Sequence, residues 1–404
     1  MSVTHAAGSS TPGDGALDAD LILVGGGLAN GLIAWRLAAE RPALRLLMLE
    51  AGPTLGGNHT WSFHPTDLSE AQRAWLAPLV AHRWSGHEVR FPQRRRCLQG
   101  GYASLTSERF HALLSTLLGP RARTGMAVQD IAPTQVRLAD GRVLRARAVI
   151  DGRGLRRSAH LALGHQKFLG QELRLEAPHG LDTPLLMDAT VDQIDGYRFV
   201  YVLPFSDYTL LVEDTYYADA GELDAEALRR RIAQYAAARG WRVRHVLREE
   251  QGVLPIVLSG DVEGFWREAG GVPASGLSAG LFHPTTGYSL PDAVALAELV
   301  AAQPDLSATA LFEAIRRHAV ERWEARGFFR LLNRMLFRSA PPHLRWKVMQ
   351  RFYGLPEGLI ARFYAARLGP LDKLRIVSGK PPVPLGAAVR AVLDRPPSHA
   401  EAPR

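Results

Sequence analysis

Two adjacent carboxyl groups, Glu213 and Asp214, stand in a run of apolar and aromatic residues, Leu210-Leu211-Val212-Glu213-Asp214-Thr215-Tyr216-Tyr217. A carboxylic acid in apolar surroundings has a raised pKa, stays neutral near pH 7 and can donate a proton as a general acid. The run predicts a β-strand, in which neighbouring side chains point to opposite faces, so only one carboxyl group reaches a substrate directly. An ordinary pair of charges at the end of a strand is the alternative interpretation.

A glycine-rich turn forms the second candidate site. Gly25-Gly26-Gly27-Leu28-Ala29-Asn30-Gly31 follows an apolar run and opens a helical pattern. Its backbone N–H groups could hold a pyrophosphate at the positive end of the helix, and a Cβ atom there would block the close approach. Glu50 ends the next apolar run, the usual place for an acidic side chain that binds ribose hydroxyls. Asn30 replaces the last glycine of the usual fingerprint, and a purely structural turn is the alternative.

The elements around this turn have the order of a parallel α/β unit. The apolar run 19–24, the helical pattern 28–39 and the apolar run 45–50 predict a strand, a helix and a second strand. A further helix is expected over 106–118. The turn 139–141, Ala-Asp-Gly, predicts a hairpin that leads into another strand, so the sheet continues beyond residue 100.

The chain then changes character twice. Two β-rich runs over 197–217 surround one turn, which is typical of an antiparallel sheet in a separate domain. From Pro291 onward the chain is rich in Ala and Leu and predicts helices, which end at the proline-rich segment 380–384.

Composition limits the class of protein. With 404 residues and 47% apolar content, the chain can fold as two or three domains around sizeable cores. The formal charge of +8 at pH 7 is carried mostly by arginine, which fits either a GC-rich genome or a basic surface that faces anionic lipid. No zinc-finger spacing, RNA-binding aromatic motif or basic recognition helix accompanies this charge, so we expect no nucleic-acid partner.

Metal and disulfide chemistry is not expected. Cys97 is the only cysteine, which excludes an intramolecular disulfide and a cysteine-rich metal site. His59, His64 and His283 have no acidic or cysteine partner at ligand spacing, so we interpret them as loop histidines and expect no metal. The sequence contains no window of 18 consecutive apolar residues, and its N-terminus lacks the features of a signal peptide, so we expect a cytoplasmic protein without a membrane span.

Two further segments indicate which dinucleotide is bound. Ala146-Arg147-Ala148-Val149-Ile150-Asp151-Gly152 reads as a strand that ends in Asp-Gly, and Ala279-Gly280-Leu281-Phe282-His283-Pro284-Thr285-Thr286-Gly287-Tyr288-Ser289 precedes a helix. Both resemble cofactor-contacting segments of the flavoprotein hydroxylase superfamily, in which the second holds the ribityl chain and the flavin ring. The resemblance implies FAD, with cofactor contacts expected at Gly25, Gly27, Leu28, Ala29, Asn30, Glu50, Arg109, Asp151, Gly280, Pro284, Thr285, Thr286 and Gly287.

Longer segments resemble one family, the bacterial lycopene β-cyclases. They are Gly56-Gly57-Asn58-His59-Thr60-Trp61-Ser62-Phe63-His64, Ala148-Val149-Ile150-Asp151-Gly152-Arg153-Gly154, Met187-Asp188-Ala189-Thr190-Val191-Asp192-Gln193, Tyr197-Arg198-Phe199-Val200-Tyr201, Arg248-Glu249-Glu250-Gln251-Gly252 and Met349-Gln350-Arg351-Phe352-Tyr353-Gly354-Leu355-Pro356. The resemblance covers the chain from about residue 20 to residue 384. It departs from the expected pattern at Ser278, where we expect a basic residue.

This resemblance implies an α/β fold with three parts. We expect a Rossmann-type, flavoprotein hydroxylase-like FAD-binding domain over 19–64, 105–165 and 270–303, an antiparallel β-sheet substrate domain over 65–104 and 166–269, a helical membrane-facing region over 304–390, and flexible tails over 1–18 and 391–404.

The family also implies the reaction, an isomerisation that closes the linear ends of lycopene into β-rings and gives β-carotene by way of γ-carotene. Protonation of a terminal double bond gives a cation, the neighbouring double bond attacks it, and a ring proton leaves. FAD would work in its reduced form without net turnover, with NADPH as the expected electron source. The matching family segment carries the proposed acid, which assigns Glu213 as the acid and Asp214 as a group that orients it. Trp61, Phe63 and Tyr288 are expected to contact the substrate, since aromatic faces stabilise cations.

Lycopene and other ψ-end carotenoids dissolve in bilayers, so the resemblance implies peripheral association with the inner membrane. Over 328–338 the apolar residues follow helical spacing and the arginines lie on another face: Phe328, Leu331, Leu332, Met335 and Leu336 against Arg330, Arg334 and Arg338. Such a helix either meets the membrane or packs on the protein's own core. Other enzymes of the carotenoid pathway are further expected partners.

Two other functions share the cofactor segments. A FAD-dependent hydroxylase or reductase that acts on an isoprenoid is the first alternative, and a carrier of isoprenoids that has lost the flavin is the second. The intact glycine turn, Glu50 and the loop around Gly287 argue against the carrier.

Overall fold

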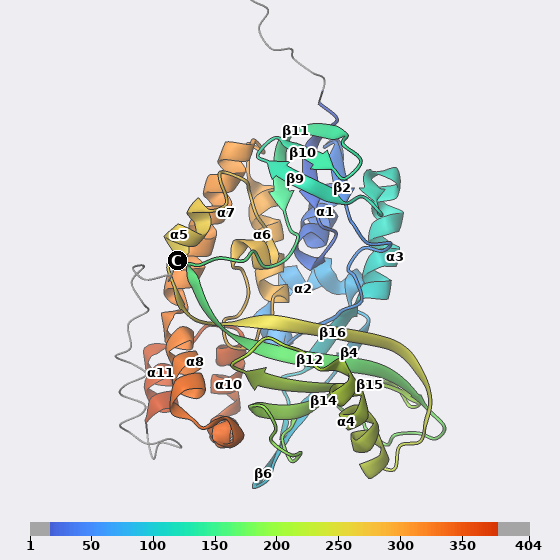
Figure 1. Cartoon of the computed structure of the whole chain (residues 1–404), viewed down its shortest axis with the longest axis vertical. Helices are drawn as coiled ribbons and strands as arrows, with labels where there is room; N and C mark the ends of the chain where they lie inside the picture. The colour runs from blue at the N-terminus through green and yellow to red at the C-terminus, as the bar shows by residue number, and fades with distance from the viewer. Residues whose placement is uncertain (1–16, 379–404) are drawn as a thin grey trace, which may run out of the picture.

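The computed structural model of the chain describes residues 17–378. The proline-rich segment predicted over 380–384, the tail 391–404 and most of the tail 1–18 lie outside the described residues. Figure 1 shows one end of the molecule built around α1, α3 and α6, a large sheet at the other end, and the C-terminal helices beside that sheet.

The first part is a six-stranded sheet in the order β8-β2-β1-β11-β10-β9. Its strands are β1 (Ala19–Val24), β2 (Leu46–Leu49), β8 (Ala122–Arg123), β9 (Val128–Ala132), β10 (Gln135–Leu138) and β11 (Val143–Asp151). β1 lies between β2 and β11 and is parallel to both, whereas β9, β10 and β11 are antiparallel. The predicted strand, helix and strand unit and the predicted hairpin between β10 and β11 are therefore confirmed.

Helices cover this sheet. They are α1 (Leu28–Glu40), α3 (Ser107–Leu118), α5 (Val262–Arg267), α6 (Leu290–Ala302) and α7 (Ala308–Ala325). α1 and α3 approach closely at Gly31, where a Cβ atom would lie 2.1 Å from the Phe110 ring. The glycine that permits close packing of the first helix thus stands one position after the usual last glycine of the fingerprint. The helices predicted over 106–118 and from Pro291 onward are confirmed.

The second part is a seven-stranded sheet in the order β16-β12-β15-β14-β13-β5-β6. Its strands are β5 (His87–Phe91), β6 (Arg94–Leu98), β12 (Leu161–Leu175), β13 (Leu185–Asp188), β14 (Tyr197–Ser206), β15 (Thr209–Ala218) and β16 (Val243–Gly260). All neighbours are antiparallel except β13 and β5, and the hairpin predicted over 197–217 is β14 with β15. Helix α4 (Ala225–Ala238) packs on one face through Leu228 and Ile232, which join a core with Val212 and Tyr216.

Two smaller groups complete the fold. A three-stranded sheet contains β3 (Thr60–Phe63), β4 (His82–Trp84) and β7 (Tyr102–Thr106), with α2 (Glu70–Leu76) between β3 and β4 in the chain. The C-terminal helices are α8 (Gly327–Ser339), α9 (Arg345–Phe352), α10 (Glu357–Tyr364) and α11 (Pro370–Val377). α8 buries Phe329, Asn333, Leu336 and Phe337. Of the apolar face predicted over 328–338, Leu336 belongs to the core, Phe328 and Leu332 pack against it while partly exposed, and Leu331 and Met335 are half-buried.

Candidate active site

A row of side chains crosses four strands of the large sheet. In the strand register, Tyr201 on β14 pairs with Glu213 on β15, Glu213 pairs with Gly170 on β12, and Gly170 pairs with Glu250 on β16. Directly paired residues project from the same face of a sheet. Glu213 and Glu250 therefore face the same way, with a glycine between them and a tyrosine beside them.

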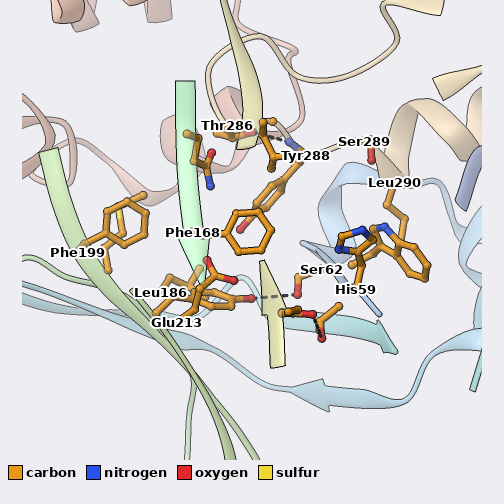
Figure 2. A pocket seen from close by; sticks show the side chains of 18 of the residues that line it. His59, Ser62, Phe168, Leu186, Phe199, Glu213, Thr286, Tyr288, Ser289 and Leu290 are labelled. Atoms are coloured by element: carbon orange, nitrogen blue, oxygen red, sulfur yellow. Dashed lines mark hydrogen bonds between the residues drawn. The ribbon is translucent and has the colours of Figure 1, made fainter. Parts of the chain in front are cut away.

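This face forms the floor of a cavity of about 210 Å³. Its other walls come from β3 and from the loop that precedes α6. Figure 2 shows Glu213 and Phe168 on the sheet and Thr286, Tyr288, Ser289 and Leu290 on the loop and helix start. The lining residues are His59, Thr60, Trp61, Ser62, Gln166, Phe168, Leu186, Met187, Phe199, Tyr201, Glu213, Tyr217, Glu250, Leu254, Leu277, Thr286, Gly287, Tyr288, Ser289, Leu290 and Tyr364. The predicted acid and the predicted flavin loop thus meet in one cavity.

Glu213 is a neutral acid at pH 7. Burial raises its pKa to about 8, and the nearby Glu250 carboxyl group contributes to this rise. The Thr215 hydroxyl donates a hydrogen bond to Glu213 Oε1 and opposes the shift. A carboxyl group held neutral in apolar and aromatic surroundings is suited to give a proton to a weakly basic substrate.

Glu250 is a second buried carboxyl group that the sequence interpretation did not assign. Burial raises its pKa to about 7, and Arg248 opposes the rise. The Arg248 Nη1 atom donates to Glu250 Oε2 at 3.0 Å, and the Thr60 hydroxyl donates to the same oxygen at 3.3 Å. The sequence Arg248-Glu249-Glu250 contains two adjacent glutamates, of which only one can face the cavity. Which of them does so depends on the strand register, which the sequence alone does not give.

The structure corrects the role of Asp214. Its side chain projects from the opposite face of β15, is fully buried, and pairs with Arg198 rather than with Glu213. The alternation of side chains along a strand separates the two carboxyl groups. Asp214 therefore does not orient Glu213, and Thr215 is the neighbour that contacts it.

Hydroxyl groups link the aromatic residues of the cavity. The Tyr102 hydroxyl lies 3.0 Å from the Tyr201 hydroxyl and 2.7 Å from the Tyr288 hydroxyl, and Tyr201 also bonds Ser62. Trp61 and Tyr288 line the cavity as expected. Phe63 does not line the cavity, and its assignment as a substrate contact is corrected. Its side chain is 1% exposed and belongs to the core that packs against the six-stranded sheet.

The glycine turn lies between β1 and α1. Gly25 has φ +88°, and a Cβ atom there would lie 2.8 Å from the Gly152 carbonyl oxygen. At Gly27, the residue before α1, a Cβ atom would have no protein atom within 4 Å, so open space lies in front of the helix start. Glu50 accepts hydrogen bonds from the Gly26 and Gly52 N–H groups, both at 2.7 Å. Leu28 and Ala29 form the uncapped first turn of α1, which suits an anionic pyrophosphate.

Asn30, which stands in place of the usual last glycine, stabilises the turn through its side chain. Its Nδ2 atom donates to the Val24 and Gly25 carbonyl oxygens, both at 2.9 Å, and its Oδ1 atom accepts from the Ser275 hydroxyl at 2.7 Å. The side chain therefore ties the turn to the segment that precedes the flavin loop. Only its backbone N–H group remains for the expected cofactor contact.

The flavin loop is held by a neutral histidine. His283 Nε2 bonds the Phe363 carbonyl oxygen at 3.0 Å, and Nδ1 accepts from the Thr285 and Thr286 N–H groups. Burial lowers the pKa of His283 to about 3. Gly287 at the tip of this loop has φ +72°.

Polar atoms beside the loop have no protein partner. They are the Thr285 hydroxyl oxygen and the Gln166 amide oxygen, both buried, and Gln166 lies next to Gly287. Orphaned polar atoms, a glycine at the loop tip and an open helix start fit a bound flavin dinucleotide.

Other predicted cofactor residues lie near these elements. Asp151 ends β11 and pairs with Arg153. Gly280 and Pro284 line a smaller neighbouring cavity. Arg109 is exposed and donates to the Pro78 carbonyl oxygen at 2.8 Å, so its cofactor contact stays a prediction. Where a basic residue is expected at Ser278, Arg156 donates to the Ser278 carbonyl oxygen.

The family model of lycopene cyclase proteins matches residues 20–390. The chain belongs to the lycopene cyclase family. Lycopene beta-cyclase of Pseudescherichia vulneris is 57% identical over 380 residues, covering 94% of this chain and 98% of that protein. Lycopene beta-cyclase of Pantoea ananas is 55% identical over 374 residues, covering 93% and 98%.

The fold of this lycopene cyclase family member occurs among FAD-dependent enzymes. A variant of HpxO from Klebsiella pneumoniae, solved in complex with FAD, matches with a TM-score of 0.58 at 14% identity and covers 87% of this chain and all of that chain. At this identity the likeness concerns the fold alone. It confirms the predicted flavoprotein hydroxylase-like fold class.

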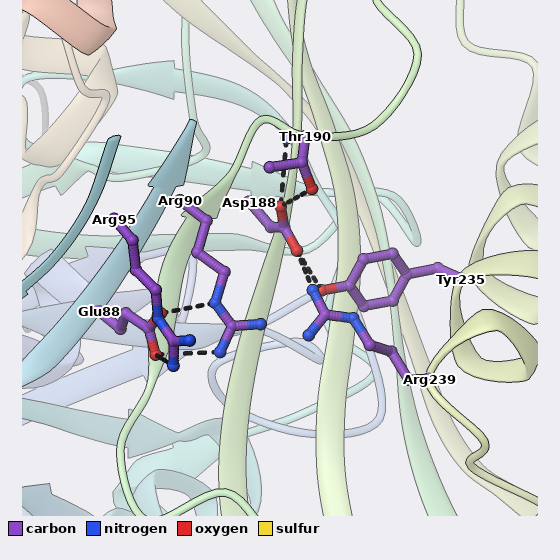
Figure 3. A network of polar contacts seen from close by, with 7 residues as sticks. All are labelled: Glu88, Arg90, Arg95, Asp188, Thr190, Tyr235 and Arg239. Carbon is purple, nitrogen blue, oxygen red and sulfur yellow. Dashed lines mark hydrogen bonds and ion pairs between the residues drawn. The ribbon is translucent and has the colours of Figure 1, made fainter. Parts of the chain in front are cut away.

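Some polar residues of the lycopene cyclase segments support the sheet rather than the cavity. Asp188 accepts from the Tyr235 hydroxyl at 2.8 Å and the Thr190 hydroxyl at 2.5 Å, and it pairs with Arg239 (Figure 3). Tyr235 belongs to α4, and Arg239 follows it directly. The network therefore anchors α4 to β13, which lies between β14 and β5 in the sheet.

Within residues 17–378, no three His, Cys, Asp or Glu side chains are grouped so that they could hold a metal ion. In the same residues, no helix of this lycopene cyclase family member has the length and apolar character to cross a membrane. His59 lines the cavity, and burial beside Arg248 lowers its pKa.

Proposed function

We propose that this chain is a flavin-dependent lycopene β-cyclase, an isomerase that closes the linear ends of lycopene and gives β-carotene by way of γ-carotene. The observation that carries the proposal is the neutral Glu213 in an aromatic cavity beside the flavin loop, in a chain of the lycopene cyclase family. Cyclisation needs one strong proton donor and a dry cavity that tolerates positive charge.

The side chains support each step. Neutral Glu213 donates its proton to the terminal double bond, and the tertiary cation that results is attacked by the neighbouring double bond. Tyr201, Tyr217 and Tyr288 surround the cavity, and burial raises the pKa of each, so they stay neutral and present ring faces and hydroxyl dipoles to the cation.

FAD would be held by the glycine turn, Glu50 and the loop over 284–287. When bound in its reduced, anionic form, it would supply negative charge that stabilises the cationic intermediates, with NADPH as the electron source. The chain's own part is to leave open space at Gly27, to offer the uncapped start of α1, and to hold the loop through His283.

Substrate would come from a lipid surface, at which the chain would associate peripherally with the inner membrane. Leu371 and Leu374 on α11 are 81% and 62% exposed, the largest values among the large hydrophobic residues described. Lys373 and Arg375 stand between and beside them. Exposed leucines among cations fit an anionic membrane surface, where other enzymes of the carotenoid pathway could pass on their product.

The test is product analysis with purified protein, lycopene dispersed in lipid and reduced FAD under anaerobic conditions. We expect γ-carotene followed by β-carotene, both with the mass of lycopene, and no consumption of NADPH beyond that needed to reduce the flavin. A product heavier by oxygen or by two hydrogens would identify the hydroxylase or reductase function instead. A purified protein that binds no flavin would support the carrier.

A further inference from the structure

The cavity contains two carboxyl groups, and the acid step uses only one. Glu250 is 3% exposed and lines the same cavity as Glu213. Its Oε2 atom accepts from Arg248 and from the Thr60 hydroxyl, and the Thr60 backbone N–H group also lowers its pKa, so these donors favour the ionised form. A carboxylate that lines a reaction cavity is suited to accept a proton.

Gly170 keeps the space between the two carboxyl groups open. It pairs with Glu213 on one side and with Glu250 on the other. A Cβ atom at this position would lie 3.4 Å from Glu213 Cβ and 3.3 Å from Glu250 Cγ, so any larger residue would stand between the two side chains. The two carboxyl groups are near enough for Glu250 to raise the pKa of Glu213.

We propose that Glu250 is the base that removes the ring proton, and that Glu213 and Glu250 share one proton over Gly170. This inference rests on the role of Glu213 as the acid. Glu213 gives its proton to the substrate and becomes a carboxylate, and the carbon–carbon bond of the ring forms. Glu250 then takes the proton from the ring carbon whose electrons form the new double bond. The proton passes from Glu250 to Glu213, which restores the starting state with no net gain or loss of protons or electrons.

The charges around the pair fit one shared proton. Arg248 is the cation that faces Glu250, and Glu108 and Glu172 lie on its other side. His59 lines the cavity near Arg248, and Tyr201 stands beside Glu213. The charge of Asp214, on the opposite face of β15, also raises the pKa of Glu213. Two carboxyl groups that repel each other lose their protons in two separate steps, and the singly protonated pair is populated between those steps.

The test compares Glu250→Gln with Glu249→Gln in the flavin-loaded enzyme. Glu249 is the adjacent carboxylate, but it is paired with Arg229 at 2.7 Å and bonded to Gln171, on the opposite face of the strand. We expect Glu250→Gln to lower β-ring formation by about 10²–10⁴-fold, the usual cost of losing a general base. Glu249→Gln should keep the rate within about twofold, and Glu250→Asp, which restores a carboxylate, should recover part of it.

The pH profile separates a base from a structural residue. In the unaltered enzyme the rate should fall at low pH as Glu250 gains a proton and at high pH as Glu213 loses one. In Glu250→Gln the low-pH limb should disappear, and the high-pH limb should move to lower pH because the negative charge near Glu213 is lost.

A Glu250→Gln enzyme with near-normal rate and both limbs would overturn the inference, while an inactive Glu213→Gln beside it would keep the acid assignment. If Glu213→Gln were active as well, the proposed acid step would fall with it. A Glu250→Gln protein that loses flavin and stability, without rescue by Glu250→Asp, would make Glu250 a structural residue and would also overturn the inference.

Discussion

The guanidinium group of Arg198 holds both carboxylate oxygens of Asp214, with Nε 2.8 Å from Oδ1 and Nη2 2.7 Å from Oδ2. This pair is buried on the α4 side of the sheet, while the preceding residue in the chain, Glu213, faces the cavity. We therefore expect Asp214 to contribute to stability and Glu213 to contribute to catalysis. The two roles can be measured separately, because each carboxyl group can be replaced by the amide of the same size.

We predict that Glu213→Gln lowers cyclisation by about 10³–10⁴-fold with unchanged flavin content, because an amide cannot donate a proton of similar acidity. Asp214→Asn should instead leave the rate per flavin-loaded molecule within a few-fold and lower the free energy of unfolding by about 3–5 kcal/mol, since Arg198 stays buried without its counter-charge. Rates from lycopene at matched flavin occupancy, together with denaturant unfolding, give both quantities. An inactive but stable Asp214→Asn enzyme would contradict this division.

At the glycine turn, Gly27→Val should abolish FAD binding and leave the apo-protein folded. A Cβ atom at residue 27 would have no protein atom within 4 Å, so the valine would extend into the open space proposed for the pyrophosphate. Gly25→Ala is the contrasting variant, because Gly25 has φ +88° and its Cβ atom would meet the Gly152 carbonyl oxygen, so the fold itself should suffer. Flavin absorbance and thermal unfolding of the apo-proteins distinguish the two effects. Stoichiometric flavin in Gly27→Val would remove the site assignment.

Buried neutral histidines should make the protein sensitive to acid. Burial lowers the pKa of His87 to about 3, and both ring nitrogens lack a hydrogen-bond partner. The unfolded chain binds a proton at His87 below about pH 6.5, whereas the folded protein does not until about pH 3, so the free energy of unfolding falls as pH decreases through this range.

His87→Phe removes one proton-binding group and should flatten the decline by up to about 1.4 kcal/mol per pH unit. The same change at the exposed His343 is the control and should leave the slope unchanged. Denaturant unfolding between pH 4 and pH 7 checks both variants. Equal slopes for His87→Phe and the unaltered protein would show that His87 does not contribute.

The sequence was informative where local rules act. The turn after β1, the strand character of 210–217 and the hairpin at 139–141 each follow from residues a few positions apart, and the structure has all three. The opposite orientation of Glu213 and Asp214 was also predicted, since it needs only the alternation along one strand.

What could not be predicted depends on partners distant in the chain. Glu250 becomes a cavity residue only through its pairing with Gly170, eighty positions away in the sequence. Arg198 as the partner of Asp214, and the burial of Phe63, require the register of two strands and the packing of β3 against the core. The role of Asn30, which departs from the glycine fingerprint, depends in the same way on Ser275, whose hydroxyl donates to its amide oxygen.

The last prediction concerns the lipid surface. The protein should sediment with anionic liposomes and less with neutral ones, and Leu371→Ser combined with Leu374→Ser should weaken binding to anionic liposomes by at least about tenfold, since each leucine contributes roughly 1–2 kcal/mol of apolar burial. Leu247 on β16 is 54% exposed, so Leu247→Ser is a matched control that should bind like the unaltered protein. Both variants should keep their flavin and their rate with detergent-dispersed lycopene, because neither site lines the cavity. Equal sedimentation of the double variant and the control would place the membrane contact elsewhere than on α11.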